Sequence, residues 1–272
     1  GSGKTTILKK MGELSKSNFD SEKPLISNFD WLEPKEATLL LTSMGLSSVP
    51  TWLRPFHLLS NGEQYRAELA YKVGKAKDDE VILVDEYTSV VDRDVAKAMS
   101  FALQKYIRKT NKRIILASCH FDIMEWLMPD WTCSPQKGGA LERGQYLRQG
   151  KPKIELQISR VEADTWEFFK KHHYLTEMNN KAYAHYLFTW NQRIVGIVVV
   201  SPLPSAYIKR AFRESRIVVL PDFQGLGLGY EMSKFIGGIY KNDGRRYYTK
   251  TVHPALGESR NKRLNEWRGT ND

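Results

Sequence analysis

The sequence predicts two consecutive domains, the first of the α/β class and the second of the α+β class. Its 272 residues are enough for each domain to bury a core. The stretch GSGKTT precedes a helical pattern, and the apolar run VILV ends in two carboxylates. The second half alternates apolar and polar residues, then reads QGLGLG before another helical pattern. Alternation is typical of antiparallel strands, whereas a continuous apolar run is typical of a buried parallel strand.

Composition excludes several classes of protein. The longest aliphatic stretch, IVGIVVVS around Ile197–Val200, is far shorter than the ~20 apolar residues that cross a bilayer. We also expect no signal peptide. The two cysteines, Cys119 and Cys133, have neither the spacing of metal ligands nor that of a disulfide framework. The sequence therefore predicts a cytoplasmic protein with no membrane partner.

The first six residues match the second half of the phosphate-binding pattern G-x-x-x-x-G-K-[ST]. In this pattern backbone N–H groups face phosphate, the lysine reaches the β- and γ-phosphates, and the hydroxyl binds Mg²⁺. Lys4 and Thr5 take the last two roles. The first glycine of the pattern and the strand before it do not occur, so we expect the sequence to begin inside a domain. The residues predicted to contact ATP are Gly1, Ser2, Gly3, Lys4, Thr5 and Thr6.

The stretch Val81–Asp92, which reads VILVDEYTSVVD, predicts a metal and water site at the end of a central strand. Ligands of α/β folds lie at the C-terminal ends of the strands. Asp85 is placed to hold hydrated Mg²⁺, which prefers one or two carboxylates plus phosphate oxygens. Glu86 is placed to orient and deprotonate the attacking water. The predicted metal ligands are thus Thr5 and Asp85, and the predicted base is Glu86.

A third motif, LSNGEQ, stands at the start of another helical pattern. Ser60 and the N–H groups around Gly62 would form an anion site at the N-terminus of this helix. The alternative is an ordinary helix cap, with Ser60 or Asn61 as the N-cap residue. Glu63 or Gln64 would then lie in the first turn.

These motifs, with the turn Ser89–Asp92 and the strand RIILASCH that leads to His120, resemble those of the ABC-type ATPases. The resemblance implies a P-loop NTPase fold, ATP and Mg²⁺ as ligands, and His120 as the residue that senses the γ-phosphate. It also implies an ATP-dependent, head-to-tail homodimer, in which Ser60 and Gly62 contact the ATP bound by the partner chain. Transporters of this family carry a glutamine before the third motif, but no Gln precedes Gln64. A transporter motor therefore ranks last among the interpretations.

The second predicted domain begins near Gly150, where the composition changes at RQGKPK. The two domains are therefore 1–150 and 151–272. IELQISRV reads as a strand, ADTWEFFKKHHYL as an amphipathic helix, and KAYAHYLFTW with RIVGIVVVS as a hairpin that turns at Asn191 and Gln192. The next strand, ESRIVVL, is broken by Pro221 before the glycine-rich turn.

The glycine-rich turn predicts a pyrophosphate cradle. Glycines let the backbone approach a pyrophosphate, the helix that starts near Gly229 directs N–H groups at it, and Pro221 lets the strand splay. The form Gln-x-x-Gly-x-Gly resembles the acyl-CoA site of the GNAT acyltransferase superfamily. A dinucleotide-binding G-x-G-x-x-G loop and a purely structural turn are the rival interpretations. The resemblance implies that acetyl-CoA or another acyl-CoA binds at Val219, Gln224, Gly225, Leu226, Gly227, Leu228 and Gly229.

The proton donor of an acyl transfer is the weakest part of this resemblance. GNAT enzymes often protonate the departing thiolate with a tyrosine, and this sequence has Ser259 about where that tyrosine is expected. His253 and Glu258 are the candidate proton carriers, and Asn261 is a candidate cofactor contact. A transfer that depends on positioning and on a backbone N–H at the thioester carbonyl needs no dedicated base.

The net charge of +10 is concentrated in the second half of the chain. Residues 1–150 carry 21 basic and 19 acidic side chains, a net of +2, whereas residues 151–272 carry 20 and 12, a net of +8. The excess predicts an anionic partner, whether cofactor phosphates, nucleic acid or an acidic protein. Arg260, Lys262 and Arg263 are the residues predicted to contact nucleic acid.

Two functions of different classes follow. The first is an ABC-type ATPase whose ATP-dependent dimerisation positions or gates a GNAT domain. This domain transfers an acyl group to an amine, on nucleic acid or on a protein bound to it. The alternative is an ATP-dependent switch or DNA-associated assembly protein whose acyl-CoA fold binds a cofactor or partner without catalysis. The absent tyrosine favours this alternative.

Overall fold

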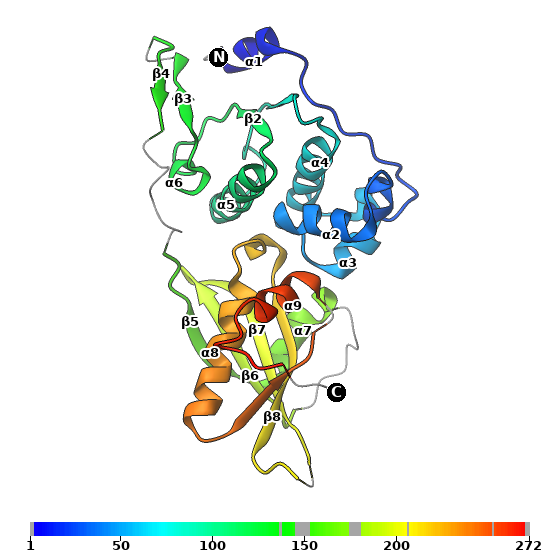
Figure 1. Cartoon of the computed structure of the whole chain (residues 1–272), viewed down its shortest axis with the longest axis vertical. Coiled ribbons are helices and arrows are strands. Elements are labelled where there is room, and N and C mark those ends of the chain that lie inside the picture. Colours follow the sequence, from blue (N-terminus) through cyan, green and yellow to red (C-terminus); the bar gives the residue numbers. More distant parts are fainter. Residues whose placement is uncertain are drawn as a thin grey trace. The chain divides into compact units, whose positions relative to one another are not determined.

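The computed structural model describes residues 3–135, 138–144, 153–173, 181–205, 207–251 and 253–269. The chain divides into two compact units (Figure 1). The first unit consists of Gly1–Ser47, Thr51–Lys153 and Pro221–Leu226, and the second of Ser48–Pro50, Ile154–Leu220 and Gly227–Asp272. The predicted boundary near Gly150 lies outside the described residues.

The first unit is mainly helical. Its helices are α1 (Lys4–Met11), α2 (Pro34–Ser43), α3 (Val49–Leu53, shared with the second unit), α4 (Asn61–Lys75), α5 (Arg93–Thr110) and α6 (Met124–Leu127), with short 3₁₀ helices at Leu25–Phe29 and Phe56–Leu58. Strands β1 (Val81–Val84) and β2 (Arg113–Leu116) pair in parallel, as the continuous apolar run of β1 predicts. Strands β3 (Trp131–Cys133) and β4 (Leu141–Arg143) form an antiparallel pair.

One small apolar cluster connects α1 to β1 in the first unit. Leu8 of α1 packs with Leu83 of β1 and with Ala117, which follows β2. The backbone N–H of Ser15 also donates to the carbonyl of Leu83 at 3.3 Å. Because the side chains at i and i+2 of a strand share a face, the residue two positions after Leu83 is brought toward the same side. That residue is Asp85.

The second unit is built on a five-stranded sheet in the order β5-β6-β7-β8-β9. Its strands are β5 (Gln157–Val161), β6 (Ala184–Trp190), β7 (Arg193–Pro202), β8 (Ala211–Val219) and β9 (Arg246–Thr249), and its helices are α7 (Trp166–Phe169), α8 (Leu228–Asn242) and α9 (Pro254–Asn261). β5 to β8 are antiparallel, whereas β8 and β9 are parallel. Within the described residues, no helix is both long and apolar enough to span a bilayer.

The predicted hairpin in the second unit is present. β6 and β7 pair from Trp190 opposite Arg193 onward, and the two residues between them form the turn. Both turn residues have left-handed backbones, with φ of 49° at Asn191 and 63° at Gln192. Two successive positive φ angles are typical of the turn whose twist matches that of paired strands. Asn tolerates this conformation better than most residues do.

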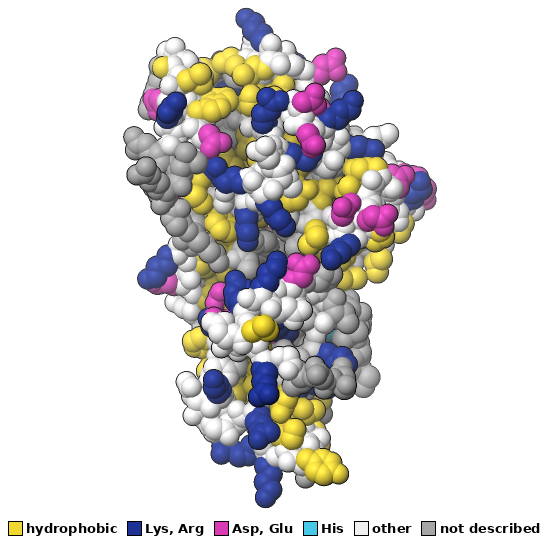
Figure 2. Space-filling model, in the orientation of Figure 1, with side chains coloured by type: hydrophobic (Ala, Val, Ile, Leu, Met, Phe, Trp, Pro, Cys, Tyr) yellow, Lys and Arg dark blue, Asp and Glu magenta, His cyan; other side chains and the backbone are white. Residues whose placement is uncertain are grey.

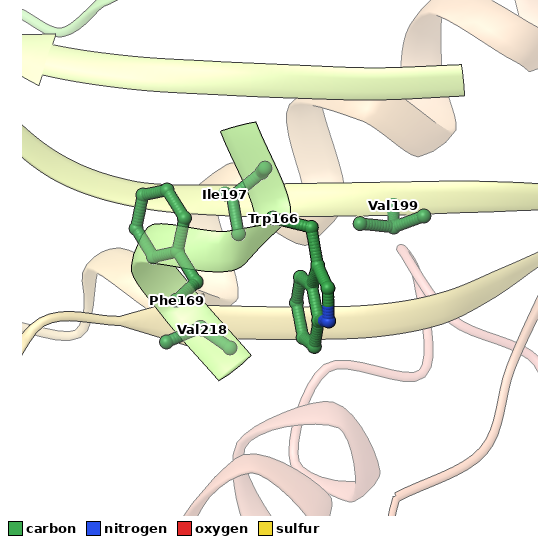
Figure 3. Close-up of a cluster of buried hydrophobic side chains, with 5 residues drawn as sticks. All are labelled: Trp166, Phe169, Ile197, Val199 and Val218. Atoms are coloured by element: carbon green, nitrogen blue, oxygen red, sulfur yellow. The ribbon is translucent and has the colours of Figure 1, made fainter. Parts of the chain in front are cut away.

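The sheet and α7 enclose the core of the second unit. Figure 3 shows Trp166 and Phe169 of α7 against Ile197 and Val199 of β7 and Val218 of β8. Ile197 and Val199 point to the same face because successive strand residues alternate. Trp166 and Phe169 lie three apart on one face of the short helix. All five side chains are buried.

Replacing Trp166 by Ala should destabilise the second unit strongly. The side chain is fully buried, and deleting a buried Trp costs about 3–5 kcal/mol because the surrounding core does not close the cavity. The adjacent Phe168 is 49% exposed, so Phe168→Ala is a matched control in the same helix. Urea unfolding monitored by circular dichroism would compare the two. Equal costs for both variants would contradict the packing in Figure 3.

β9 is shorter than β8 and pairs only with its first part. Their pairing runs from Ala211 opposite Arg246 to Glu214 opposite Thr249, while β8 continues to Val219. A register shift between β7 and β8 occurs at the same level, between Val199 and Val200. Bulges of this kind increase the local twist of a strand. Among the described residues, β9 therefore pairs with β8 only as far as Glu214.

Candidate functional sites

The predicted phosphate loop ends in helix α1. Gly1 and Ser2 lie outside the described residues, and Gly3 is the N-cap with φ of 75°. A side chain at Gly3 would meet no atom within 4 Å, so glycine is required here for its backbone conformation. Lys4 is the first helical residue, and Thr5 and Thr6 are exposed in the first turn. The start of a helix is a common anion site, because its first N–H groups have no partner within the helix itself.

Asp85 and Glu86 lie directly after β1, where the sequence predicts them. Asp85 is partly buried and Glu86 is exposed. The backbone N–H of Glu86 donates to Oδ1 of Asp85 at 2.9 Å, and Glu86 has a left-handed φ of 50°. No group of three His, Cys, Asp or Glu side chains able to hold a metal occurs among the described residues. A Mg²⁺ here would need the phosphate oxygens of a nucleotide to complete its ligands, as this metal usually does.

Ser60 caps helix α4 through a capping box. Its Oγ accepts from the backbone N–H of Glu63 at 3.4 Å, and Glu63 Oε2 accepts from the backbone N–H of Ser60 at 3.0 Å. This is the helix cap that the sequence left as an alternative. Ser60 itself is exposed, so the same N-terminus can also receive an anion. A side chain at Gly62 would only touch Val91 at 3.9 Å.

Glu63 is the buried member of this cap. Its Oε1 accepts from Thr51 Oγ1 at 3.0 Å and lies 3.5 Å from Nη2 of Arg54. Burial raises the pKa of Glu63, but hydrogen bonds from Ser60 and Thr51 outweigh it, so the pKa lies below the ordinary 4.5. The carboxylate therefore stabilises the fold in its ionised form.

The stability contributed by Glu63 should depend on pH. It is fully present above the unfolded pKa of about 4.5 and is lost as the pH falls through the lower folded value. Glu63→Gln should cost about 1–2 kcal/mol at pH 7 through loss of the cap and should flatten the change in the urea midpoint between pH 7 and pH 3. Glu68→Gln, on a half-exposed position of the same helix, is the control. A variant that keeps the full pH dependence of the wild type would refute this role.

The turn after Glu86 is tied to α4 and to the segment after β2. The backbone N–H of Thr88 donates to the Tyr65 hydroxyl at 3.2 Å, and burial raises the pKa of Tyr65 to about 12. Arg93 Nη1 donates to the Thr88 carbonyl at 3.4 Å, while its Nη2 pairs with Asp122 at 2.5 Å. The sequence indicated none of these links.

His120, the predicted γ-phosphate sensor, lies four residues after β2 and is partly buried. Its backbone N–H donates to Ser118 Oγ at 3.1 Å. The segment is held by the pair between Arg93 and Asp122, and the hydrogen bond from Arg93 lowers the pKa of Asp122. His120 and the Thr88 turn are thus positioned through a shared arginine.

The glycine-rich turn is divided between the units. Residues up to Leu226 group with the first unit, and those from Gly227 group with the second. Gln224 is buried, and its Oε1 accepts from the backbone N–H of Ser47 at 2.5 Å. Its assignment to acyl-CoA stays a prediction, as does that of Val219, which ends β8.

Gly227 is the N-cap of α8. Its φ of 77° is left-handed, and a side chain there would meet no atom within 4 Å. Helix α8 starts at Leu228, one residue before Gly229 and close to where the sequence predicts. Gly225 also has a left-handed φ of 85°. Both glycines therefore hold backbone conformations that residues with a Cβ rarely adopt.

A buried polar network that the sequence did not indicate lies where the pairing of β8 with β9 ends. Glu214 of β8 is 6% exposed and Arg260 of α9 is 7% exposed. Glu214 Oε1 accepts from Arg260 Nη2 at 2.9 Å, and Oε2 accepts from Ser233 Oγ at 2.6 Å and from the Tyr247 hydroxyl at 3.0 Å. Burial raises the pKa of Tyr247, and Glu214 raises it further. The phenol therefore keeps the proton that it donates.

The network corrects one sequence prediction. Arg260 does not provide a surface contact for nucleic acid, because it is buried and paired with Glu214. Arg263 is exposed, but its Cζ lies 4.2 Å from the centre of the Tyr230 ring, over which the guanidinium group stacks. Lys262 is exposed, and its Nζ lies 3.7 Å from Oε2 of Glu258. The C-terminal tail is therefore partly committed to contacts within its own unit.

The predicted acyl-transfer residues gather on α9. His253 is the N-cap residue, and its backbone N–H donates to Thr251 Oγ1 at 3.1 Å. Glu258 and Asn261 lie three apart on the helix, a spacing that puts them on one face. Ser259, which takes the place of the expected tyrosine, is partly buried. The positions of these residues depend on the position of α9, which the pair between Arg260 and Glu214 connects to β8.

Comparisons with known proteins give similarities to parts of the chain. No protein-family model matches the sequence, and no curated protein matches it significantly. Among solved structures, a possible acetyltransferase from Clostridium difficile 630 has 10% identity and a TM-score of 0.35, and covers 44% of this chain and 95% of its own. An aminoglycoside acetyltransferase from an uncultured soil metagenomic sample, in complex with trehalose, has 14% identity and a TM-score of 0.32, and covers 43% of this chain and 93% of its own.

A third similarity is to an ATP-binding cassette, a dimeric structure of a post-hydrolysis state bound to ADP and Pi. It has 15% identity and a TM-score of 0.37. It covers 47% of this chain, which spans 60% of that cassette. Each of the three similarities therefore covers less than half of this chain.

Proposed function

We propose that the first unit binds and hydrolyses ATP in the manner of an ABC-type ATPase. The observation that carries this proposal is the apolar cluster of Leu8, Leu83 and Ala117, which packs the helix after the phosphate loop against the strand before the carboxylates. Lys4 would contact the β- and γ-phosphates, and Thr5 and Asp85 would hold Mg²⁺. When bound, Mg²⁺ neutralises charge that develops on the phosphate oxygens.

Within this proposal Glu86 accepts a proton from the attacking water. The exposed Glu86 carboxylate lies one residue beyond the metal ligand, so it can reach a water beside the γ-phosphate. The exposed N-terminus of α4, with Ser60 and Gly62, takes the γ-phosphate of an ATP bound by a second copy of the chain. His120 contacts the same phosphate from its own chain. ATP thus becomes part of the dimer interface.

We further propose that the second unit transfers an acyl group from acyl-CoA to an amine. The left-handed Gly227 at the N-terminus of α8 supports a pyrophosphate site, and the stretch of β8 beyond its pairing with β9 supports a place for the acyl-bearing arm. The amine nitrogen attacks the thioester carbonyl, so that a C–N bond forms and the C–S bond breaks. The proton lost by the amine passes to the departing thiolate, with His253 or Glu258 as the candidate carrier.

A substitution at Gly227 tests the cofactor site. Gly227→Asp should weaken acetyl-CoA binding at least about 10-fold, because the carboxylate would repel the pyrophosphate and a side chain is strained at positive φ. Gly238→Asp is the control, since it adds the same charge at an open position of the same helix. Isothermal titration calorimetry measures both affinities. Equal affinities for both variants would remove the pyrophosphate assignment.

The transfer reaction needs its own test, because Ser259 replaces the expected tyrosine and so favours an ATP-dependent switch that binds a cofactor without catalysis. Labelled acetyl-CoA, incubated with RNA, DNA and protein with and without ATP, distinguishes the two. Transfer of label to an acceptor supports the enzyme. Tight binding of acetyl-CoA with no transfer to any acceptor supports the switch.

A further inference from the structure

One end of the second unit carries a cluster of basic side chains. The cluster lies on the segment between β7 and β8, on the start of β8, and from the last turn of α8 to the start of β9. Figure 2 shows Lys and Arg side chains over this end, with no Asp or Glu visible beside them in that view. The members of this basic end are Lys209, Arg210, Arg213, Lys241, Arg245 and Arg246.

Backbone contacts hold the members of the basic end together. The backbone N–H of Arg246 donates to the Arg210 carbonyl at 3.0 Å, and Arg210 Nη2 donates to the Asp243 carbonyl at 3.0 Å. Arg213 lies two residues beyond Ala211, which pairs with Arg246. Asp243 is the acidic residue between α8 and β9, and its Oδ2 lies 3.6 Å from Nη2 of Arg245. The six cations therefore keep a large excess of positive charge within a small region.

A tyrosine stands out from the same end. Tyr207 is 96% exposed. The backbone N–H groups of Tyr207 and Ile208 both donate to Ser205 Oγ, at 3.2 and 3.1 Å. The side chain of Tyr207 is therefore presented almost wholly to solvent. An exposed aromatic ring beside basic side chains is the arrangement on which the bases of a single strand stack.

We propose that this end of the second unit binds single-stranded nucleic acid. The basic side chains contact successive phosphates, and Tyr207 stacks on a base beside them. A single strand is favoured over a duplex because its bases are free to stack on an aromatic ring. This inference rests on the proposed function and deepens it, because it names nucleic acid as the class of acceptor and this end as the surface that binds it. The basic end takes the place of the C-terminal tail as the proposed nucleic-acid contact, because Arg260 of the tail is buried.

The test measures binding of fluorescent dT20, U20 and a 20-bp duplex across a range of salt concentrations. The triple variant Arg210→Gln, Arg213→Gln and Arg246→Gln should bind single strands at least about 10-fold more weakly. The slope of the logarithm of the binding constant against the logarithm of the salt concentration should be less steep by about 2. Each phosphate contact on a single strand contributes ~0.7 to this slope, and the variant removes three cations. The charge-matched control is Lys35→Gln, Lys105→Gln and Lys109→Gln, at exposed positions of the first unit. It should bind like the wild type.

Tyr207→Ala provides a second readout that does not depend on charge. It should weaken single-strand binding by about 5-fold or more and leave duplex binding unchanged. Because Tyr207 is 96% exposed, its substitution should leave folding unchanged, and circular dichroism checks both variants.

Three results would overturn the proposal: undetectable binding of single strands at low salt, equal binding by the triple variant and its control, or binding of polyglutamate or anionic vesicles with the same residue dependence. Transfer of label from acetyl-CoA to a small amine is measured on the same variants. Loss of oligonucleotide binding with retained transfer separates this surface from the acyl-CoA site.

Discussion

Glu86→Gln is expected to slow ATP hydrolysis by about 10²–10⁴-fold, the contribution typical of a positioned general base. The amide keeps the size of the side chain but cannot accept the proton of the attacking water. Asp85 and the N-terminus of α1 are unchanged in this variant, so ATP binding should persist. Phosphate release measures the rate, and light scattering at saturating ATP should detect a stable dimer that the wild type forms only transiently.

The control for this variant is Glu80→Gln, at the opposite end of β1. Glu80 is exposed and precedes the strand, whereas Glu86 follows it, so the control should hydrolyse ATP at the wild-type rate. Two outcomes separate the parts of the proposal. An unchanged rate in Glu86→Gln would show that the base is another residue. A slow variant that stays monomeric with bound ATP would instead remove the role of Ser60 and Gly62 across a dimer interface.

Arg260→Ala is expected to destabilise the second unit by about 3–5 kcal/mol, because it leaves the carboxylate of Glu214 buried without its cation. Glu214 is 6% exposed and also accepts hydrogen bonds from Ser233 and Tyr247, which lie on α8 and β9. Helix α9 should loosen as well, since Arg260 connects it to the sheet. Urea unfolding measures the loss of stability, and hydrogen exchange over α9 measures the local opening.

A double variant distinguishes the loss of an ion pair from the loss of packing. Glu214→Gln combined with Arg260→Met removes both charges while keeping most of the volume, so it should be more stable than Arg260→Ala. Arg263→Ala, at an exposed position shortly after the same helix, should cost under about 1 kcal/mol. If Arg260→Ala costs no more than Arg263→Ala, the network does not hold α9 in place.

Local patterns in the sequence were sufficient for several parts of the structure. The apolar run before Asp85 predicted a parallel strand, and β1 pairs in parallel with β2. Alternation around Asn191 and Gln192 predicted a hairpin, and both residues have the left-handed backbone that such a turn requires. Helices α1 and α8 begin close to their glycines, at Lys4 and Leu228. In each case neighbouring residues carry the whole physical cause, either as periodicity or as backbone conformation.

Contacts between residues distant in the sequence could not be predicted from local patterns. Arg260 looked like part of a basic tail, because charged side chains near the end of a chain are usually solvated. Only the fold brings it to Glu214, 46 positions earlier in the chain, and buries both. The basic end likewise joins residues on either side of α8, which the chain order separates.

The sequence by itself thus determined the strand that carries Asp85 and Glu86 and the glycines at which α1 and α8 begin. The tertiary structure alone decided which charges are buried in pairs and which remain on the surface. The reason is physical. A motif acts through residues that are adjacent in the chain, whereas the burial of a charge depends on every element packed around it.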